Sequence, residues 1–351
     1  MDEHAVLERL VRVYSPSGGE SAAVREFLRV ARHLGYSART DGAGNGIARI
    51  GRGRPYVVYL GHIDTVDGRL AVQRRSGRLY GRGTVDAKGP LAAALVAGPR
   101  SEGPGTYTVV AAVGEEFDSR GARYLMSRLA PDAVIAGEPS GWDGITVGYK
   151  GELQVEVGFR GRRTHYSSPE PTAADRVWAW IGSARAIAAA RAVESPFRSL
   201  TCKLVGCTAG HVGDAETASA VVDFRLPPGL STRELLELLP RADEGPAVRI
   251  RIEPLEVDRS NPVVASLVEG VRSVGGRPTL WKKGGTSDLN LVAPAWNVPG
   301  AAYGPGEARL DHTDRESVSL AELARSVEVL RVAVTRLRSG GITPRRSAGG
   351  A

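Results

Sequence analysis

Several ionisable side chains in the first half of the chain stand where an apolar run ends or a glycine-rich loop begins. They are His62, Asp64, Asp86, Glu115, Glu116 and Glu138. Imidazole nitrogens and carboxylate oxygens, without a thiolate, suit zinc, cobalt or manganese. Carboxylates gathered in one place repel one another unless a bound cation neutralises them. The residue types therefore indicate a metal site, although a single histidine or acid near a strand end is more often an ordinary surface or core residue.

The number of acids favours two metal ions that share a carboxylate. Such ions lie about 3.5–4 Å apart and activate a water molecule as a nucleophile at neutral pH. Glu115 and Glu116 are expected to point in opposite directions on an extended chain, so that one binds metal while the other removes a proton from the water. Asp64 shares a strand face with His62 and has the place of a carboxylate that orients a metal-bound imidazole. The predicted chemistry is hydrolysis at a two-metal centre.

The elements that must position these residues alternate between helix and strand. Short apolar runs at 46–50, 56–60, 107–113 and 133–136 are typical of strands, and helical stripes cover 20–34 and 90–97. This is the pattern of a sheet covered by helices. Ligands of such sheets bind beyond the carboxyl ends of the strands, which is where the candidate residues lie. The predicted fold class is therefore α/β, with the site residues converging at one edge of a sheet.

The middle of the chain has a different pattern. Residues 153–159 alternate apolar and polar side chains like a half-exposed antiparallel strand, and a helix at 172–193, strands at 201–205 and 218–226 and a helix at 231–239 follow. The first pattern resumes near residue 261 and ends with a helix at 318–337. We therefore expect a catalytic domain built from 1–152 and 259–339, interrupted by an α+β domain at 153–258. The tail, 340–351, has little apolar content and is expected to be disordered.

The composition is that of a globular chain. Of the 351 residues, 42% are hydrophobic and 24% charged, which is enough apolar material for a large core. No apolar run approaches the ~20 residues of a membrane span and no signal peptide is visible, so a cytoplasmic protein without membrane partners is expected. The formal charge is +7, but the arginines are scattered and are not interleaved with aromatic residues, which argues against a nucleic acid partner. A basic surface can instead attract an acidic protein or a small anion.

A series of motifs along nearly the whole chain resembles the aminoacylase, carboxypeptidase and succinyl-diaminopimelate desuccinylase family of two-zinc metallopeptidases. In order, these motifs are GHIDTV, GRGTVDAKGP, VGEEFDSRGARYL, IAGEPS, GRRTHYSSPE, DFRLPPG, GGTSDLN and GPGEARLDHTDRE. The resemblance implies two Zn²⁺ ions, with Co²⁺ as an alternative, and a cis peptide after Asp86. It implies the following roles: His62 and Glu138 hold one ion, Glu116 and His312 hold the other, Asp86 bridges them, and Glu115 is the base. His312 follows from the resemblance alone, because HTDRE in a loop is by itself an ordinary approach to a helix.

The same resemblance makes the segment 153–258 a lid that also forms the interface of a homodimer. His165 then resembles a lid histidine that reaches the partner subunit's active site and donates a hydrogen bond to the scissile carbonyl oxygen. Its alternative is a loop histidine that caps a turn before Ser167. Arg225 and the loop of Gly285, Thr286 and Ser287 resemble elements that bind a substrate carboxylate. Arg225 could equally be an outward-facing strand residue.

Within the family, the stretch GEPSGWDGITVGYKGELQVEV most resembles the hydrolases that release lysine, and in archaea also ornithine, from an amino-group carrier protein. The resemblance implies an amino acid held through its α-amino group on the γ-carboxyl of the carrier's C-terminal glutamate, and a reaction that ends lysine or arginine biosynthesis. An acidic carrier is a partner that a basic enzyme would attract. The alternatives within the family are desuccinylation of N-succinyl-diaminopimelate, deacetylation of N-acetylornithine and cleavage of short peptides. The alternative outside it is a binding protein on a peptidase scaffold.

Overall fold

The structure of the chain is a computed structural model that describes residues 1–165 and 167–342. The contacts divide the chain into two units. The first unit comprises 1–147, 257–281 and the residues from Ser287 onward, and the second comprises 148–256 and 282–286. Most of the tail that we expect to be disordered, 343–351, lies outside the described residues. Each unit has its own hydrophobic core, so each is described by itself.

The first unit is built on a mixed sheet with the strand order β1-β2-β6-β3-β7-β15-β8. The strands are β1 (Ser37–Thr40), β2 (Gly46–Arg52), β3 (Tyr56–His62), β6 (Gly105–Ala112), β7 (Ala133–Gly137), β8 (Gly144–Tyr149) and β15 (Gly300–Ala302). The central strand β3 runs parallel to both β6 and β7, while β2 and β8 pair antiparallel with their neighbours in the sheet. β3 and β6 are buried along almost their whole length, because both faces of the sheet are covered.

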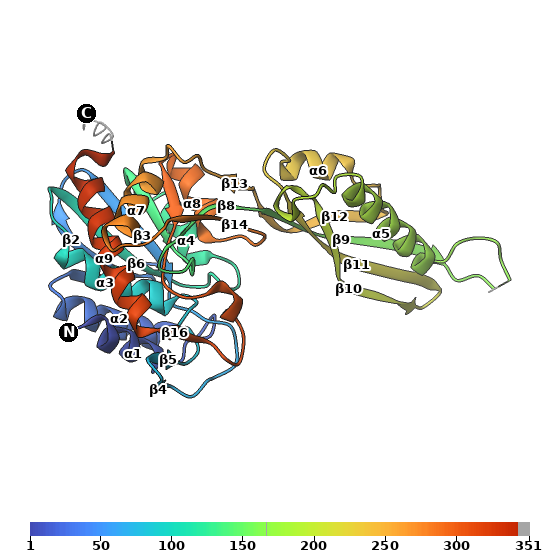
Figure 1. The fold of residues 1–351 in the computed structure, drawn as a ribbon. Coiled ribbons are helices and arrows are strands. Elements are labelled where there is room, and N and C mark those ends of the chain that lie inside the picture. The colour runs from blue at the N-terminus through green and yellow to red at the C-terminus, as the bar shows by residue number, and fades with distance from the viewer. Residues whose placement is uncertain (166, 343–351) are drawn as a thin grey trace, which may run out of the picture. The chain divides into compact units, whose positions relative to one another are not determined.

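Seven helices in the described part of this unit provide that cover (Figure 1). They are α1 (Glu3–Val11), α2 (Ser21–His33), α3 (Lys88–Arg100), α4 (Arg120–Met126), α7 (Pro262–Ser273), α8 (Asp288–Trp296) and α9 (Leu320–Arg336). α9 packs against α1, α3 and α7, whereas α4 and α8 contact each other and α8 contacts β7 and β15. The apolar stripe of α9, which includes Leu323, Val327 and Leu330, is fully buried as its spacing predicts.

A small antiparallel sheet lies beside the large one in the first unit. Its strands are β4 (Gln73–Arg75), β5 (Arg78–Tyr80) and β16 (Ser317–Ser319), with β5 between the other two. β5 immediately precedes the glycine-rich loop that carries Asp86, and β16 follows the loop that carries His312. The pairing of Tyr80 with Ser317 therefore brings together two loops that are more than two hundred residues apart in sequence.

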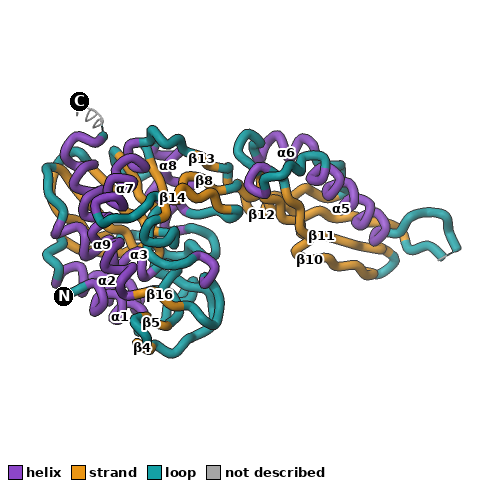
Figure 2. Tube along the Cα trace, in the orientation of Figure 1, coloured by secondary structure: helices purple, strands orange, loops and turns teal. Residues whose placement is uncertain are grey.

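The second unit is a four-stranded antiparallel sheet with two helices against one face (Figure 2). The strands follow the order β10-β11-β9-β12, with β9 (Gly151–Arg162), β10 (Thr201–Val212), β11 (Ala215–Leu226) and β12 (Glu244–Ile252), and the helices are α5 (Ala173–Ala189) and α6 (Thr232–Leu238). Burial alternates along the middle of β9, which confirms the predicted half-exposed antiparallel strand. Thr172 and Asp175 form a capping box at the start of α5.

The two remaining strands are short: β13 (Leu255–Glu256) and β14 (Thr279–Lys283). Sequence reasoning assigned residues 282–286 to the catalytic domain, but their contacts group them with the second unit. The carbonyl of Lys283 accepts the N–H of Lys150 at 3.2 Å, and Nζ of Lys282 lies 2.6 Å from a carboxylate oxygen of Glu256. The α/β fold class with a second α+β unit is confirmed.

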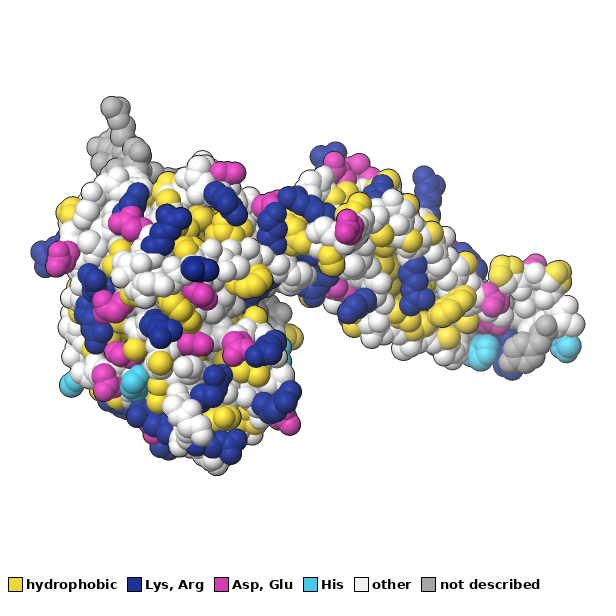
Figure 3. All heavy atoms as spheres, in the orientation of Figure 1, with side chains coloured by type: hydrophobic (Ala, Val, Ile, Leu, Met, Phe, Trp, Pro, Cys, Tyr) yellow, Lys and Arg dark blue, Asp and Glu magenta, His cyan; other side chains and the backbone are white. Residues whose placement is uncertain are grey.

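Among the described residues, no helix combines the length and the apolar content that crossing a bilayer requires. On the face drawn in Figure 3, lysine and arginine side chains are interspersed with acidic and uncharged ones. This agrees with the scattered arginines of the sequence.

Candidate metal centre and active site

The parallel pairing of β3 with β6 and β7 brings the predicted strand-end residues to one edge of the sheet. His62 is the last residue of β3 and lies opposite Ala112, the last residue of β6. On the other side of β3, Gly61 pairs with Gly137, so Glu138 follows β7 next to the position of His62. The carboxyl ends of parallel strands meet at one edge, which is why these residues converge.

Asp86 lies between two imidazoles. Its Oδ1 is 3.0 Å from Nε2 of His62, and its Oδ2 is 3.2 Å from Nε2 of His312. Nε2 of His312 is also 3.0 Å from Oε1 of Glu116. The Asp86–Ala87 peptide bond is cis, as the family resemblance implies. A carboxylate with one oxygen on each of two imidazoles has the arrangement of a bridging ligand.

The donor atoms fit a metal ion. Ligand atoms of His62, Asp86 and Glu116 all lie within 4.8 Å of one another. Nitrogen and oxygen atoms that bind one zinc ion at about 2.0–2.2 Å in a tetrahedron lie roughly 3.4 Å apart, so this spacing needs little adjustment. The described residues therefore include a group that can hold a metal ion, built from imidazole and carboxylate donors alone.

Negative charge around the two imidazoles raises their pKa values. Burial alone would lower the pKa of His62, but Asp64 and Asp86 raise it well above its ordinary value. Asp86 and Glu116 raise the pKa of His312 to about 10. Burial would raise the pKa of Asp86, yet its hydrogen bonds to His312 and His62 hold it below its ordinary value. The acids thus attract protons to the imidazoles, and a metal ion can replace those protons.

Asp64 contacts both His62, as predicted, and the backbone of Glu115 and Glu116, which was not predicted. Its backbone carbonyl accepts a hydrogen bond from Nδ1 of His62 at 3.0 Å, while its carboxylate lies 3.6 Å from that nitrogen. The carboxylate itself accepts the backbone N–H groups of Glu115 and Glu116, each at 3.1 Å. Oγ of Ser17 donates a third hydrogen bond at 2.7 Å. Asp64 is fully buried and therefore fixes both the imidazole and the turn that carries the two glutamates.

The expectation that Glu115 and Glu116 lie on an extended strand is wrong. β6 ends at Ala112, and the two glutamates stand in a turn in which the carbonyl of Gly114 accepts the N–H groups of Phe117, Asp118 and Ser119. Burial, together with the negative charges of nearby acids, raises the pKa of Glu115 well above its ordinary value. A carboxylate with a raised pKa is a stronger base and accepts a proton from water more readily. The side chains of Glu115 and Glu116 therefore take their different directions from the turn and not from the alternation of a strand.

Glu138 is half-buried directly after β7. Its charge contributes to the raised pKa values of Glu115 and of the buried Tyr59, which places its carboxylate close to both. His62, Asp86, Glu116 and Glu138 thus lie at one edge of the first unit, as the positions of the strand ends predict. His312 joins them from a loop, where its φ is +58°.

A family model described as "Peptidase family M20/M25/M40" matches residues 58–336. The chain belongs to this peptidase family. The predicted resemblance is confirmed, and with it the predicted class of enzyme: this peptidase is an amide hydrolase.

Curated relatives match this peptidase over most of its length. A LysW-lysine hydrolase of Deinococcus radiodurans is 38% identical over 342 residues, covering 92% of this chain and 93% of the relative. A LysW-lysine/LysW-ornithine hydrolase of Sulfurisphaera tokodaii is 28% identical over 326 residues, covering 91% of this chain and 90% of the relative.

Solved structures share the fold of this chain. The aminopeptidase PepT of Bacillus cereus superposes with a TM-score of 0.75 at 19% identity, covering 96% of this chain and 99% of that one. A metallo-carboxypeptidase of the same family from Sulfolobus solfataricus gives a TM-score of 0.72 at 19% identity, covering 95% and 99%. These likenesses concern the whole fold, including the second unit.

His165 lies in an exposed loop of the second unit. The backbone N–H of Ser167 donates to its Nδ1 at 3.2 Å, and Oγ of Ser167 lies 2.7 Å from the same nitrogen. Its carbonyl accepts the N–H of Ser168 at 2.8 Å, so the residue also closes a turn. Because Nδ1 accepts a backbone N–H, the neutral imidazole carries its proton on Nε2. The ring therefore presents a hydrogen-bond donor to solvent.

Arg225 belongs to β11 and is engaged by two acids of the second unit. Its Nε is 3.0 Å from Oδ1 of Asp223, and its Nη1 is 2.9 Å from Oε2 of Glu152. An arginine has five N–H donors, so these contacts leave donors for a ligand. Burial raises the pKa of Glu152 to about 7, although Arg225 acts against this shift. Sequence reasoning did not foresee this acidic pair.

The loop of Gly285, Thr286 and Ser287 is divided between the units. Gly285 is exposed with open space where a Cβ would stand. Oγ1 of Thr286 donates to Glu152 at 3.3 Å, within the second unit. Ser287 is the N-cap of α8 and forms a capping box with Asn290, so its hydroxyl is used by the helix.

Sequence reasoning missed several buried charged residues near the centre. They are Arg82, Lys88, Asp288 and Glu316. Burial lowers the pKa of Lys88 to about 7, and its Nζ donates to the carbonyl of Val13 at 2.7 Å. Burial raises the pKa of Asp288 to about 6. All four stand inside the quoted motifs, which was the available signal, but a charged residue in a loop is usually solvated and gives no sign of burial.

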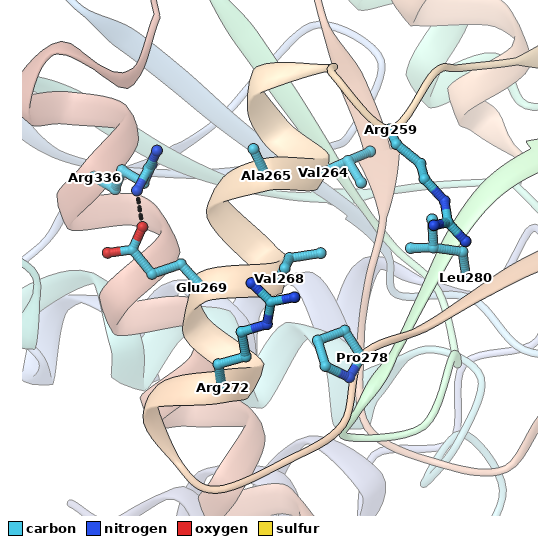
Figure 4. A pocket seen from close by; sticks show the side chains of 9 residues that line it. All are labelled: Arg259, Val264, Ala265, Val268, Glu269, Arg272, Pro278, Leu280 and Arg336. Atoms are coloured by element: carbon cyan, nitrogen blue, oxygen red, sulfur yellow. Dashed lines mark ion pairs between the residues drawn. The ribbon is translucent and has the colours of Figure 1, made fainter.

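A hollow of about 480 Å³ lies away from the centre, beside α7 (Figure 4). Its wall combines apolar side chains, such as Val264, Val268 and Leu280, with charged ones. The charged side chains are Arg259, Arg272, Glu269 and Arg336, and the last two form an ion pair. None of the candidate site residues lines it. The chemistry of the centre and this cavity are therefore separate features of the first unit.

Proposed function

We propose that this peptidase hydrolyses the amide that joins lysine, and also ornithine, to the γ-carboxyl of the C-terminal glutamate of an acidic amino-group carrier protein, as the last step of lysine or arginine biosynthesis. The observation that carries the two-metal part of the proposal is Asp86, with one carboxylate oxygen on His62 and the other on His312. The relatives named LysW-lysine hydrolase and LysW-lysine/LysW-ornithine hydrolase support the substrate.

The proposed cofactor is a pair of Zn²⁺ ions, with Co²⁺ as a substitute. His62 and Glu138 would hold one ion, Glu116 and His312 the other, and Asp86 both. Bound there, the ions would polarise the amide carbonyl and lower the pKa of a water molecule. The absence of thiolate from the group supports zinc or cobalt over softer metals.

In this proposal Glu115 moves the proton. It takes a proton from the attacking water as the water oxygen bonds to the amide carbon, and it passes that proton to the leaving α-amino nitrogen as the C–N bond breaks. Its raised pKa supports this role, since the same carboxyl must first accept and then donate at neutral pH. Asp64 holds the backbone of Glu115 in place during both transfers.

We also propose a homodimer formed through the second unit, in which His165 of one protomer reaches the active site of the other. β10 is an edge strand of twelve residues that pairs only with β11 in the described part of the chain, and it is exposed along most of its length. Trp178 on α5 is 64% exposed. An exposed strand edge and an exposed aromatic residue are features of a surface that another chain covers. Nε2–H of His165 would then donate to the carbonyl oxygen that becomes negative in the transition state.

The carboxylate of the lysyl group would be held by Arg225 and the loop of Gly285, Thr286 and Ser287. The free donors of Arg225 support this role, while its ion pairs with Asp223 and Glu152 orient the guanidinium. The net charge of +7 supports attraction of an acidic carrier.

The test is a comparison of substrates with the zinc-loaded protein. Lysine release from the carrier conjugate should exceed hydrolysis of N-succinyl-diaminopimelate, N-acetylornithine and dipeptides in kcat/KM. Faster hydrolysis of any of these small substrates would overturn the carrier assignment and leave the two-metal chemistry in place. The ornithine conjugate, run in parallel, measures the preference between the two amino acids.

A further inference from the structure

The loops that carry Asp86 and His312 are connected by more than the pairing of β5 with β16 (Figure 1). Each loop also sends one buried charged side chain into the other. These side chains are Arg82, from the Asp86 loop, and Glu316, from the His312 loop. We call this pair the clasp.

Glu316 holds the backbone of the Asp86 loop. Its Oε1 accepts the N–H groups of Gly83 at 2.9 Å, Val85 at 2.9 Å and Asp86 at 3.2 Å. Three N–H donors on one carboxylate oxygen define the orientation of three peptide groups, the last of which is that of Asp86 itself. The side chain is 1% exposed, so no water can replace it without rearrangement.

Arg82 holds the His312 loop in return. Its Nη1 donates to the carbonyl of Thr313, the residue after His312, at 3.0 Å, and its Nε donates to the carbonyl of Gly68 at 3.0 Å. Nη1 also lies 2.8 Å from Oε2 of Glu316, and the two side chains are almost fully buried. The ion pair therefore ties the two halves of the clasp to each other.

We propose that Glu316 and Arg82 are positioning residues that set the distance between the shared carboxylate of Asp86 and the imidazole of His312, and thereby the affinity of the second metal site. The inference rests on the proposed two-metal function. Neither residue is assigned as a metal ligand; they act through the backbone of Gly83, Val85, Asp86 and Thr313, to which they are hydrogen-bonded.

The geometry makes the effect selective for one of the two sites. His62 ends a strand that is buried from Val57 onward and is held by the backbone carbonyl of Asp64, so its position does not depend on the clasp. His312 is 49% exposed, stands in a loop at φ +58°, and has no strand to hold it. Loss of the clasp should therefore loosen the site of His312 and Glu116 far more than the site of His62 and Glu138.

The experiment is a calorimetric titration of the metal-free full-length protein with ZnCl₂, repeated with CoCl₂ and read by the visible spectrum of cobalt. Glu316→Gln removes the charge and leaves one acceptor oxygen. We expect the affinity for the second ion to fall about 10- to 100-fold, as for other residues that support metal ligands, while the first stays within roughly threefold. The cobalt spectrum of the first ion should remain that of the wild type.

The matched control is Glu26→Gln, which makes the same chemical change at another buried, arginine-paired carboxylate of the same unit. Glu26 binds Arg9 and Arg29 on the surface of α1 and α2, away from the candidate residues. It should lower the melting temperature without changing either metal affinity. If Glu316→Gln does not fold, Arg82→Lys keeps the positive charge but loses the guanidinium fork that reaches Gly68 and Thr313, and it should weaken the same second site.

Two outcomes overturn the inference and differ from each other. A wild-type protein that binds two ions, with variants that bind both ions unchanged or lose both equally, would overturn the clasp and leave the proposed function intact. A wild-type protein that binds a single ion would overturn the two-metal function and the clasp with it.

Discussion

Oδ1 of Asp64 accepts the backbone N–H of Glu115 at 3.1 Å. Asp64, two residues beyond the end of β3, thus holds the residue that is proposed to move the proton. Oδ2 of the same carboxylate accepts the N–H of Glu116, so one buried carboxylate fixes the backbone of both glutamates. The position of Glu115, the proposed proton acceptor, therefore depends on this contact.

Replacing Asp64 should therefore impair both metal binding and catalysis. Asp64→Asn replaces one acceptor oxygen with an NH₂ group and leaves a buried N–H without a partner, which costs about 1–3 kcal/mol of stability. We expect metal affinity to fall by about 10–100-fold with the fold retained, as circular dichroism would show. Ser17→Ala, which removes only the third hydrogen bond to Asp64, is the control and should change both quantities much less. Unchanged metal content and unchanged kcat in Asp64→Asn would contradict the role.

Glu115→Gln should separate metal binding from turnover. The amide keeps the shape of the side chain but cannot accept the proton, so kcat should fall by about 10²–10⁴-fold. Zinc content, measured by atomic absorption after gel filtration, should stay at the wild-type level because Glu115 is not assigned as a ligand. Retained activity would remove Glu115 from the reaction.

The metal-free protein should lose stability as the pH rises through the titration of His312. Its pKa is raised from 6.5 to about 10 by Asp86 and Glu116, so the protonated ring stabilises the fold. That contribution is complete below pH 6.5 and disappears as the pH passes about 10. The melting temperature of chelator-treated protein should exceed that of His312→Gln at pH 6.5, and the difference should shrink towards pH 10. A difference that does not vary with pH would show that the ring is neutral in the metal-free state.

His165 should act across the dimer. Glu115→Gln and His165→Ala homodimers are each expected to be inactive, but a mixed dimer would contain one site with both residues intact. After random exchange of subunits at equal concentrations, about one quarter of the wild-type activity should return. No recovery, with exchange verified by native mass spectrometry, would place His165 in its own protomer's site or outside catalysis. Ser167→Ala keeps the backbone N–H on Nδ1 and should retain most of the activity.

Electrostatic attraction of the carrier predicts a salt effect that small substrates lack. Between 20 and 500 mM NaCl, kcat/KM for the carrier conjugate should fall at least about tenfold, because screening weakens the long-range attraction of opposite net charges. The value for a short γ-glutamyl-lysine compound should change much less. Equal salt dependence for both would remove the proposed role of the positive surface.

The sequence alone predicted that His62 and Glu138 lie at neighbouring strand ends on one edge of the sheet. The apolar run that precedes His62 and the one that precedes Glu138 had to lie side by side in a sheet, since parallel strands bury such runs on both faces, and their carboxyl ends then had to meet. Residue type also determined the proposed donor set of nitrogen and oxygen atoms, because no cysteine stands near these positions in the sequence. The α/β class and the second α+β unit followed from the change of periodicity.

Only the tertiary structure decided which loops lie next to each other and which side chains connect them. His312 and Glu316 are more than two hundred residues from Asp86 and Arg82, and no local periodicity links them; the pairing of β5 with β16 does. The turn at Glu115, the acidic partners of Arg225 and the N-cap role of Ser287 were equally hidden, because each depends on which side chain fills the space beside it. Local pattern reports which face of an element is buried, whereas the partner of a buried charge is chosen by packing across the whole chain.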